Sequence, residues 1–247
     1  MDRIIKEDET LDDLQLKGIH VIQKKQAFRF GIDAVLLANF PTIKNGAKVV
    51  DLCSGTGIIS FILAGKTNAS NIIGIEIQKE IADMAKRSIK YNNLQEKVRF
   101  IEGDLKNLKL LKDIEKVDVV TVNPPYKTQG TGIININDKN AISRHEICCT
   151  LDDVVKAAKV LLKDKGKLYM IHRPDRIVDI MNVMRKYYIE PKLIRTIHPA
   201  VDKPPSMILI EGQKNGGKFL KWDSLYIFMM KIINIQMKLK EFMEWNK

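Results

Sequence analysis

Short apolar runs and longer amphipathic segments alternate along the chain between Ala47 and Glu211. Apolar runs of a few residues rich in Val and Ile are typical of buried strands, whereas apolar residues three or four positions apart are typical of a helix packed on a sheet. This pattern predicts strands at 48–52, 72–76, 98–101, 117–122 and 166–171, and helices after Gly57 and at 79–92, 150–163 and 174–188. The order of these elements is that of stacked β-α-β units with a mostly parallel sheet.

The segments on either side of this region have a different pattern. Apolar runs at 191–197 and 207–211 flank a proline-containing segment, which predicts an antiparallel strand pair at one sheet edge. The segment 18–30 alternates weakly and is compatible with a hairpin leading into a short helix at 33–39. The sequence therefore predicts an α/β protein with a doubly wound, seven-stranded, mostly parallel sheet and an antiparallel edge hairpin.

This fold divides the chain into three expected parts. Residues 1–45 form an N-terminal extension, residues 46–212 form the main domain, and residues 213–247 form a tail of uncertain structure. The tail is rich in Met, Ile and Lys after Gly217, which suits either a divergent amphipathic helix or a segment translated in a shifted reading frame.

Charge and cysteine content restrict the classes of partner. The chain has 247 residues, with 41 Lys and Arg against 30 Asp and Glu, so the formal net charge is +11. Such an excess favours nucleic acid as a partner over a membrane surface, the alternative being a solvated basic surface. Three cysteines without a Cys-x-x-Cys pair indicate reduced thiols and no metal site. No apolar run reaches the roughly 18 residues of a membrane span, and the acidic amino terminus does not resemble a signal peptide, so we expect a cytoplasmic protein.

A glycine-containing loop, residues 51–57, lies where the first predicted parallel strand ends and a helix begins. Glycines let the backbone turn sharply and leave space for a ligand beside the main chain, although a tight turn without a ligand has the same pattern. Glu76 and Asp104 follow the next two strands, so they should converge with Asp51 on one sheet edge. Glu76 suits the hydroxyls of a ribose and Asp104 an adenine amino group, whereas Asp51 suits a sulfonium or ammonium group better than a pyrophosphate.

The run Asn123-Pro124-Pro125-Tyr126 directly follows the strand 117–122 and should lie on the same edge. The amino group of adenine and the amide of glutamine are poor nucleophiles because their lone pair is delocalised. The side-chain oxygen of Asn123 and the carbonyl of Pro124 can accept the N–H bonds of such a group while the lone pair attacks a methyl carbon. The prolines stiffen the loop, and Tyr126 offers a ring for stacking of a flipped base. Taken singly, these residues also suit a plain turn and a core aromatic residue.

The Asp-x-x-x-Gly-x-Gly loop and the Asn-Pro-Pro-Tyr run together resemble the class I S-adenosylmethionine-dependent methyltransferases, which have a Rossmann-like fold. Enzymes with these motifs act on N6 of adenine, N2 of guanine or the glutamine amide of release factors. The segments 13–18, 28–37, 141–146 and 171–176 resemble the bacterial tRNA (adenine-N6)-methyltransferases, which modify the adenine beside the anticodon of a valine tRNA. This resemblance covers about residues 12–212.

The resemblance implies methyl transfer from S-adenosylmethionine to adenine N6 of tRNA, with S-adenosylhomocysteine as the product. The alternatives are a glutamine methyltransferase acting on a release factor, an rRNA guanine-N2 methyltransferase, and a binding module without turnover. Release-factor enzymes carry a helical domain before the cofactor domain, and only about 45 residues precede the first predicted strand here, which favours the tRNA enzyme. The oligomeric state stays open, with a monomer favoured.

Three groups of candidate site residues follow from the motifs and the resemblance. The predicted cofactor-binding residues are Asp51, Cys53, Ser54, Gly55, Gly57, Glu76, Ile77, Asp104, Leu105 and Asn123. The predicted catalytic residues are Asn123, Pro124, Pro125 and Tyr126. Candidate RNA contacts are Lys24, Lys25, Phe28, Arg29, Arg144 and Lys203. For the first four of these, a solvated basic turn with core aromatics is the alternative, and Arg144 is as well suited to pairing with Glu146.

Overall fold

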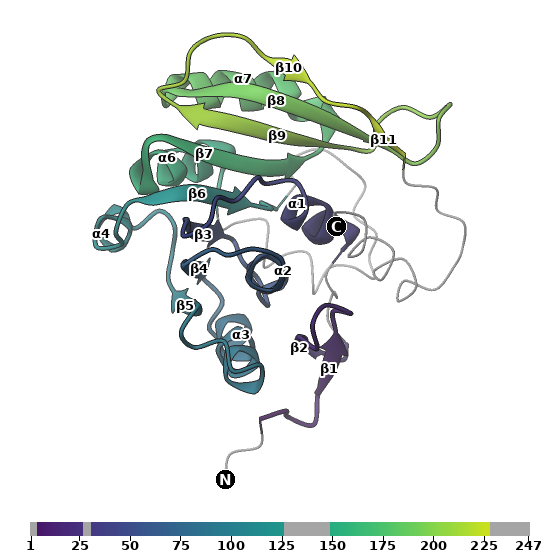
Figure 1. Ribbon diagram of the computed structural model, residues 1–247, viewed down its shortest axis with the longest axis vertical. Coiled ribbons are helices and arrows are strands. Elements are labelled where there is room, and N and C mark those ends of the chain that lie inside the picture. Colours follow the sequence, from purple (N-terminus) through teal and green to yellow (C-terminus); the bar gives the residue numbers. More distant parts are fainter. Residues whose placement is uncertain (1–3, 27–30, 126–148, 228–247) are drawn as a thin grey trace.

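The computed structural model describes residues 4–26, 31–125 and 149–227 (Figure 1). Its main sheet is built from the strands β3 (Lys48–Leu52), β4 (Asn71–Glu76), β5 (Val98–Glu102), β6 (Val117–Val122), β7 (Leu162–His172), β8 (Ile189–His198), β9 (Met207–Lys214), β10 (Lys221–Trp222) and β11 (Tyr226–Ile227). The strand order is β10-β8-β9-β7-β6-β3-β4-β5, and β11 also pairs with β8.

The pairing of these strands confirms the predicted fold class. The strand β3 lies between β4 and β6 and is parallel to both, and the parallel pairing continues to β5 on one side and β7 on the other. Only β9 is antiparallel to its neighbours β7 and β8, so these form the expected antiparallel edge. The two-residue strands β10 and β11 pair with β8 and lie in the tail 213–247, for which the sequence predicts no definite structure.

Helices cover both faces of the sheet (Figure 1). The helices α1 (Ile32–Ala38), α2 (Ile58–Lys66) and α3 (Lys79–Tyr91) contribute to one apolar core, and α4 (Leu108–Lys112), α6 (Leu151–Leu161) and α7 (Ile177–Lys186) contribute to the other. Adjacent residues of β3 are buried in different cores, because Val49 packs with the first set of helices and Val50 with the second. Burial on both faces explains why the central strands consist mainly of Val, Ile and Leu.

The strands β1 (Glu9–Asp13) and β2 (His20–Lys24) form a separate antiparallel hairpin. Its buried side packs on α3, where Ile22 N donates to Ser88 Oγ at 2.9 Å. The two terminal guanidinium nitrogens of Arg87 donate to Glu9, at 2.6 and 2.7 Å. The hairpin was predicted within 18–30, but its first strand begins at Glu9. That acidic residue is buried in contact with Arg87, which lies far along the chain, and with the backbone N–H of Lys6.

Candidate functional site

The loop between β3 and α2 turns through two glycines with left-handed backbone conformations. Gly57 caps α2 at φ 95°, and Gly55 has φ 55°. A Cβ atom on Gly57 would lie 2.7 Å from ring carbons of both Phe61 and Phe100, whereas none of the described atoms lies within 4 Å of a Cβ on Gly55. Gly57 is therefore required for its conformation and for space, and Gly55 for its conformation alone.

The Glu76 carboxylate ties this loop to the end of β4. It accepts hydrogen bonds from Gly55 N and from Gln78 N, both at 2.9 Å, and Glu76 is only 5% exposed. Oε1 also accepts from Gln78 Nε2 at 3.4 Å, whereas Oε2, which accepts from Gly55 N, has a second lone pair, so the group can hold the loop and still receive a ligand hydroxyl. The structure thus brings Glu76 and the glycine loop together, as the sequence predicts.

Ser54, in the same loop, carries a buried hydroxyl with unused hydrogen-bonding capacity. Its backbone N–H donates to Ile75 O at 3.1 Å, but in the described part of the chain its Oγ has no hydrogen-bond partner. Leaving a buried hydroxyl unsatisfied costs about 1–3 kcal/mol, so this atom suits contact with a polar ligand.

The Asp51 side chain is completely buried at the end of β3. One oxygen accepts from Thr121 Oγ1 of β6 at 2.8 Å and the other from Ser60 Oγ of α2 at 3.0 Å. Burial raises the pKa of this carboxyl to about 7. That this carboxylate faces cationic groups of a ligand stays a prediction, whereas the structure shows that Asp51 joins β3, α2 and β6.

Asp51→Asn should make the stability of the protein less dependent on pH. A carboxyl whose pKa is higher in the folded than in the unfolded state releases its proton on unfolding between about pH 4 and pH 7, so its contribution to stability is lost as the pH rises through that window. The variant has no such group. We therefore expect the free energy of unfolding of the variant, minus that of wild type, to increase by about 2–4 kcal/mol between pH 4 and pH 8. Denaturant unfolding of both proteins across this range measures the difference, and a difference independent of pH would contradict the buried titration.

Four further predicted cofactor residues lie around the same edge. The side chain of Asp104 is 35% exposed after β5, and its Oδ1 accepts from Lys106 N at 2.8 Å. Ile77 is 40% exposed beside Glu76, whereas Leu105 is buried in the core. The Cys53 sulfur lies 3.9 Å from that of Cys149, and both cysteines are free.

Asn123 lies directly after β6, with its amide nitrogen 3.0 Å from Asp33 Oδ2 of α1. Pro124 is buried and Pro125 is half-buried, whereas Tyr126 lies outside the described residues. Because β3 lies between β4 and β6, the glycine loop has Glu76 on one side and Asn123 on the other. Asp33 was not among the predicted site residues, because nothing local to the sequence indicates a contact with a residue 90 positions later.

The candidate RNA contacts are separated in the structure. Lys24 pairs with Asp8, and Lys25 Nζ donates to Glu7 O at 2.7 Å, both within the hairpin that packs on α3. Lys203 is 61% exposed in the loop between β8 and β9, and these strands lie at the opposite end of the strand order from β4 and β5. Phe28, Arg29 and Arg144 lie outside the described residues. An RNA surface that includes both the β1–β2 hairpin and the β8–β9 loop would extend from one end of the strand order to the other.

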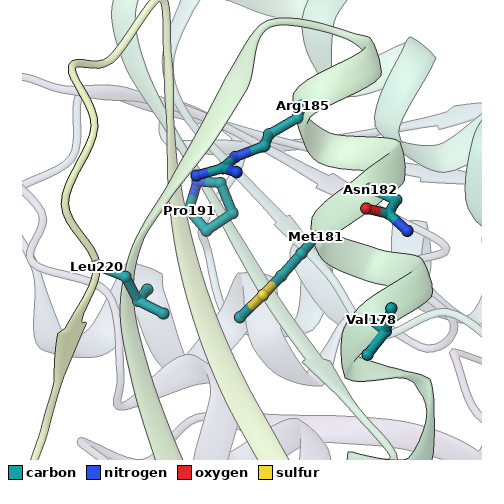
Figure 2. A pocket seen from close by; sticks show the side chains of 6 residues that line it. All are labelled: Val178, Met181, Asn182, Arg185, Pro191 and Leu220. Atoms are coloured by element: carbon teal, nitrogen blue, oxygen red, sulfur yellow. The ribbon is translucent and has the colours of Figure 1, made fainter.

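A hollow of about 200 Å³ lies apart from these residues. In Figure 2 the side chain of Met181 extends from α7 into the space between Pro191 of β8 and Leu220, which precedes β10. Its lining consists of Val178, Met181, Asn182, Arg185, Pro191 and Leu220. None of the predicted site residues lines it, so we do not place the functional site there.

Within 4–26, 31–125 and 149–227, no group of three or more His, Cys, Asp or Glu side chains is arranged to hold a metal ion. Within the same ranges, the helices are too short or too polar to cross a membrane.

Comparison with known proteins gives matches of three kinds. A family model described as "Methyltransferase domain" matches residues 43–210. Proteins named "tRNA1(Val) (adenine(37)-N6)-methyltransferase" are similar in sequence: that of Parabacteroides distasonis is 24% identical, covering 80% of this chain and 81% of its own. The protein of the same name from Bacteroides thetaiotaomicron is 23% identical, and the aligned region covers 71% of this chain and 72% of that protein. The solved structure of a predicted O-methyltransferase, Atu636 from Agrobacterium tumefaciens, aligns with a TM-score of 0.66 at 19% identity, covering 85% of this chain and 96% of that one. At this identity the structural match shows the fold alone.

Proposed function

This chain belongs to the methyltransferase-domain family over residues 43–210, and from that premise we propose that it transfers a methyl group from S-adenosylmethionine to the N6 amino group of an adenine in tRNA, next to the anticodon. The observation that carries the proposal is the arrangement of the glycine loop, Glu76 and Asn123 at the ends of three adjacent strands. The names of the similar proteins and the net charge of +11 support tRNA as the substrate.

The residues at this edge fit S-adenosylmethionine. The buried Glu76 carboxylate retains acceptor capacity for ribose hydroxyls, and the Ser54 hydroxyl, which has no partner among the described residues, suits a polar group of the methionine portion. Asp104 would accept from the adenine amino group, and Ile77 would provide an apolar surface. When bound, the cofactor supplies a methyl group made electrophilic by its sulfonium.

The chain supplies acceptors for the amino group that receives the methyl. Asn123 Oδ1 and the Pro124 carbonyl would accept its two N–H bonds, which holds the nitrogen with its lone pair directed at the methyl group. Burial of Pro124 and the fixed φ of both prolines limit movement of this loop. The proton becomes acidic only after transfer, so the proposal needs no general base. Tyr126 remains a predicted stacking surface for the base.

Substrate contacts in this proposal come from both sides of the catalytic domain. In this proposal residues 46–212 are the catalytic domain, and residues 1–45, which include Lys24 and Lys25, are an extension on the substrate side. Lys203 is exposed in the loop that follows β8. This loop is at the same sheet edge as the end of β7, because His172 is paired with Ile208. An exposed lysine at that edge suits contact with phosphate.

Competition between two acceptors tests the proposal. The purified protein is incubated with methyl-labelled S-adenosylmethionine and a mixture of undermodified tRNA and cell proteins, and the product is then treated with ribonuclease or protease. We expect ribonuclease to release nearly all of the label. Label that resists ribonuclease and is released by protease would instead favour the glutamine methyltransferase.

A further inference from the structure

An asparagine amide accepts hydrogen bonds through its oxygen and donates them through its nitrogen. The two ends are nearly equal in shape, so rotation of the amide by 180° would replace the acceptor at Asn123 with a donor. A donor directed at an amino group would not hold its N–H bonds. The proposed role of Asn123 therefore requires a neighbouring group that fixes the orientation of its amide.

Asp33 provides such a group. Its Oδ2 lies 3.0 Å from Asn123 Nδ2 and accepts a hydrogen bond from it. An ionised carboxylate only accepts hydrogen bonds, so it holds the NH2 end of the amide against α1 and directs the oxygen away from α1. The reversed amide would bring its oxygen against the negatively charged carboxylate, which is unfavourable.

The position of Asp33 is itself fixed by the fold. It is the second residue of α1, and its other oxygen accepts from Ala34 N at 3.0 Å. Val35 and Leu37 of the same helix are completely buried in the core shared with α2 and β7. A Cβ atom on Gly31, just before the helix, would lie 2.3 Å from Asp33 Oδ1, so the chain leaves room for the carboxylate. The carboxylate is thus attached to a packed helix.

We propose that Asp33 is a positioning residue for methyl transfer, which holds the Asn123 oxygen toward the incoming amino group. Its negative charge also strengthens this oxygen as an acceptor, because hydrogen bonds in a chain polarise one another. This inference rests on the proposed function for the presence of an amino group at Asn123, but the contact between the two side chains does not depend on which molecule carries that group.

The first test compares Asp33→Ala, Asp33→Asn and the control Asn39→Ala. Asn39 caps the other end of α1, where its side chain donates to Val35 O at 2.8 Å. Losing a hydrogen bond to a charged group should slow single-turnover methyl transfer by about 10–100-fold in Asp33→Ala. Asp33→Asn keeps an acceptor oxygen of the same shape and should lose about 3–10-fold. The transfer rate of the control Asn39→Ala should change by less than about twofold. In the two Asp33 variants, the tRNA dissociation constant and the affinity for S-adenosylhomocysteine should also change by less than about twofold.

A double variant separates positioning from an independent effect. If Asp33 acts through Asn123, then Asp33→Ala combined with Asn123→Ala should be no slower than Asn123→Ala alone. Multiplication of the two losses would overturn the inference, as would wild-type rates in both Asp33 variants. Asp33→Asn is isosteric and decides the question if Asp33→Ala does not fold.

The second test does not depend on activity. The side-chain amide signal of Asn123 in a nitrogen-15 NMR spectrum is identified by its loss in Asn123→Ala. Its protons should exchange with water faster in Asp33→Ala or Asp33→Asn than in wild type, and unchanged exchange in both variants would overturn the contact. Failure of the proposed function is recognised separately, because wild type would then methylate no adenine. The rate comparison would be made with the acceptor that wild type does methylate, and the NMR result would still stand.

Discussion

Asn123→Ala should slow single-turnover methyl transfer by about 10²–10³-fold while leaving tRNA affinity almost unchanged. The Asn123 oxygen is expected to bind the amino group most strongly as that nitrogen becomes pyramidal, so its loss raises the barrier more than it weakens the substrate complex. Rapid-quench measurement with saturating enzyme gives the rate, and filter binding gives the tRNA dissociation constant.

Asn107→Ala is the matched control for this variant. Asn107 caps the short helix α4, where its side chain accepts from Lys109 N and Leu110 N. It is not among the residues at the glycine loop or Asn123, and its replacement should alter stability without changing the transfer rate. A similar loss of rate in both variants would assign the effect of Asn123 to stability. An equal loss of rate and tRNA affinity in Asn123→Ala would show that Asn123 binds substrate without a special contribution to transfer.

Gly57→Val should lower the affinity for S-adenosylhomocysteine by about 100-fold or more. Position 57 lies at the start of α2, and a valine side chain there would clash with the rings of Phe61 and Phe100. A β-branched residue is also strained at the φ of 95° that this position has. Displacement of the loop would also move Gly55 N away from the Glu76 carboxylate. Titration calorimetry with S-adenosylhomocysteine measures the loss.

Gly217→Val provides the control, because none of the described atoms lies within 4 Å of a Cβ at that position. Its affinity should equal that of wild type. Thermal unfolding of both variants shows whether the Gly57 variant is folded at the temperature of the titration. A folded Gly57→Val protein with wild-type affinity would place the cofactor away from this loop.

The central strands were predictable because each is defined by its own residues. Runs such as 48–52 and 117–122 are largely buried on both faces, so they appear in the sequence as mainly apolar segments rich in Val, with the same bounds as β3 and β6. The end of α6 was predicted less well. The helix ends at Leu161 and β7 starts at the next residue, because Leu162 pairs with Val117 of β6. That pairing is a tertiary contact, which a local helical pattern does not contain.

The candidate site shows the same limit. Parallel topology alone predicts that the glycine loop and Glu76 meet, because both follow the carboxyl ends of adjacent strands. It does not predict that the hydroxyls of Ser60 and Thr121 surround Asp51, nor that Asp33 reaches Asn123. These contacts join elements far apart in the chain and depend on how the helices pack on the sheet.

Nucleoside analysis of the methylated tRNA tests the central claim most directly. Undermodified tRNA is incubated with the protein and S-adenosylmethionine carrying a heavy methyl group, digested to nucleosides and analysed by mass spectrometry beside a reaction with Asn123→Ala. We predict that the heavy methyl group appears in N6-methyladenosine with the wild-type protein and is reduced by about 10²–10³-fold with the variant. A heavy methyl group on guanosine or on another atom of adenosine, or equal labelling by both proteins, would contradict the account.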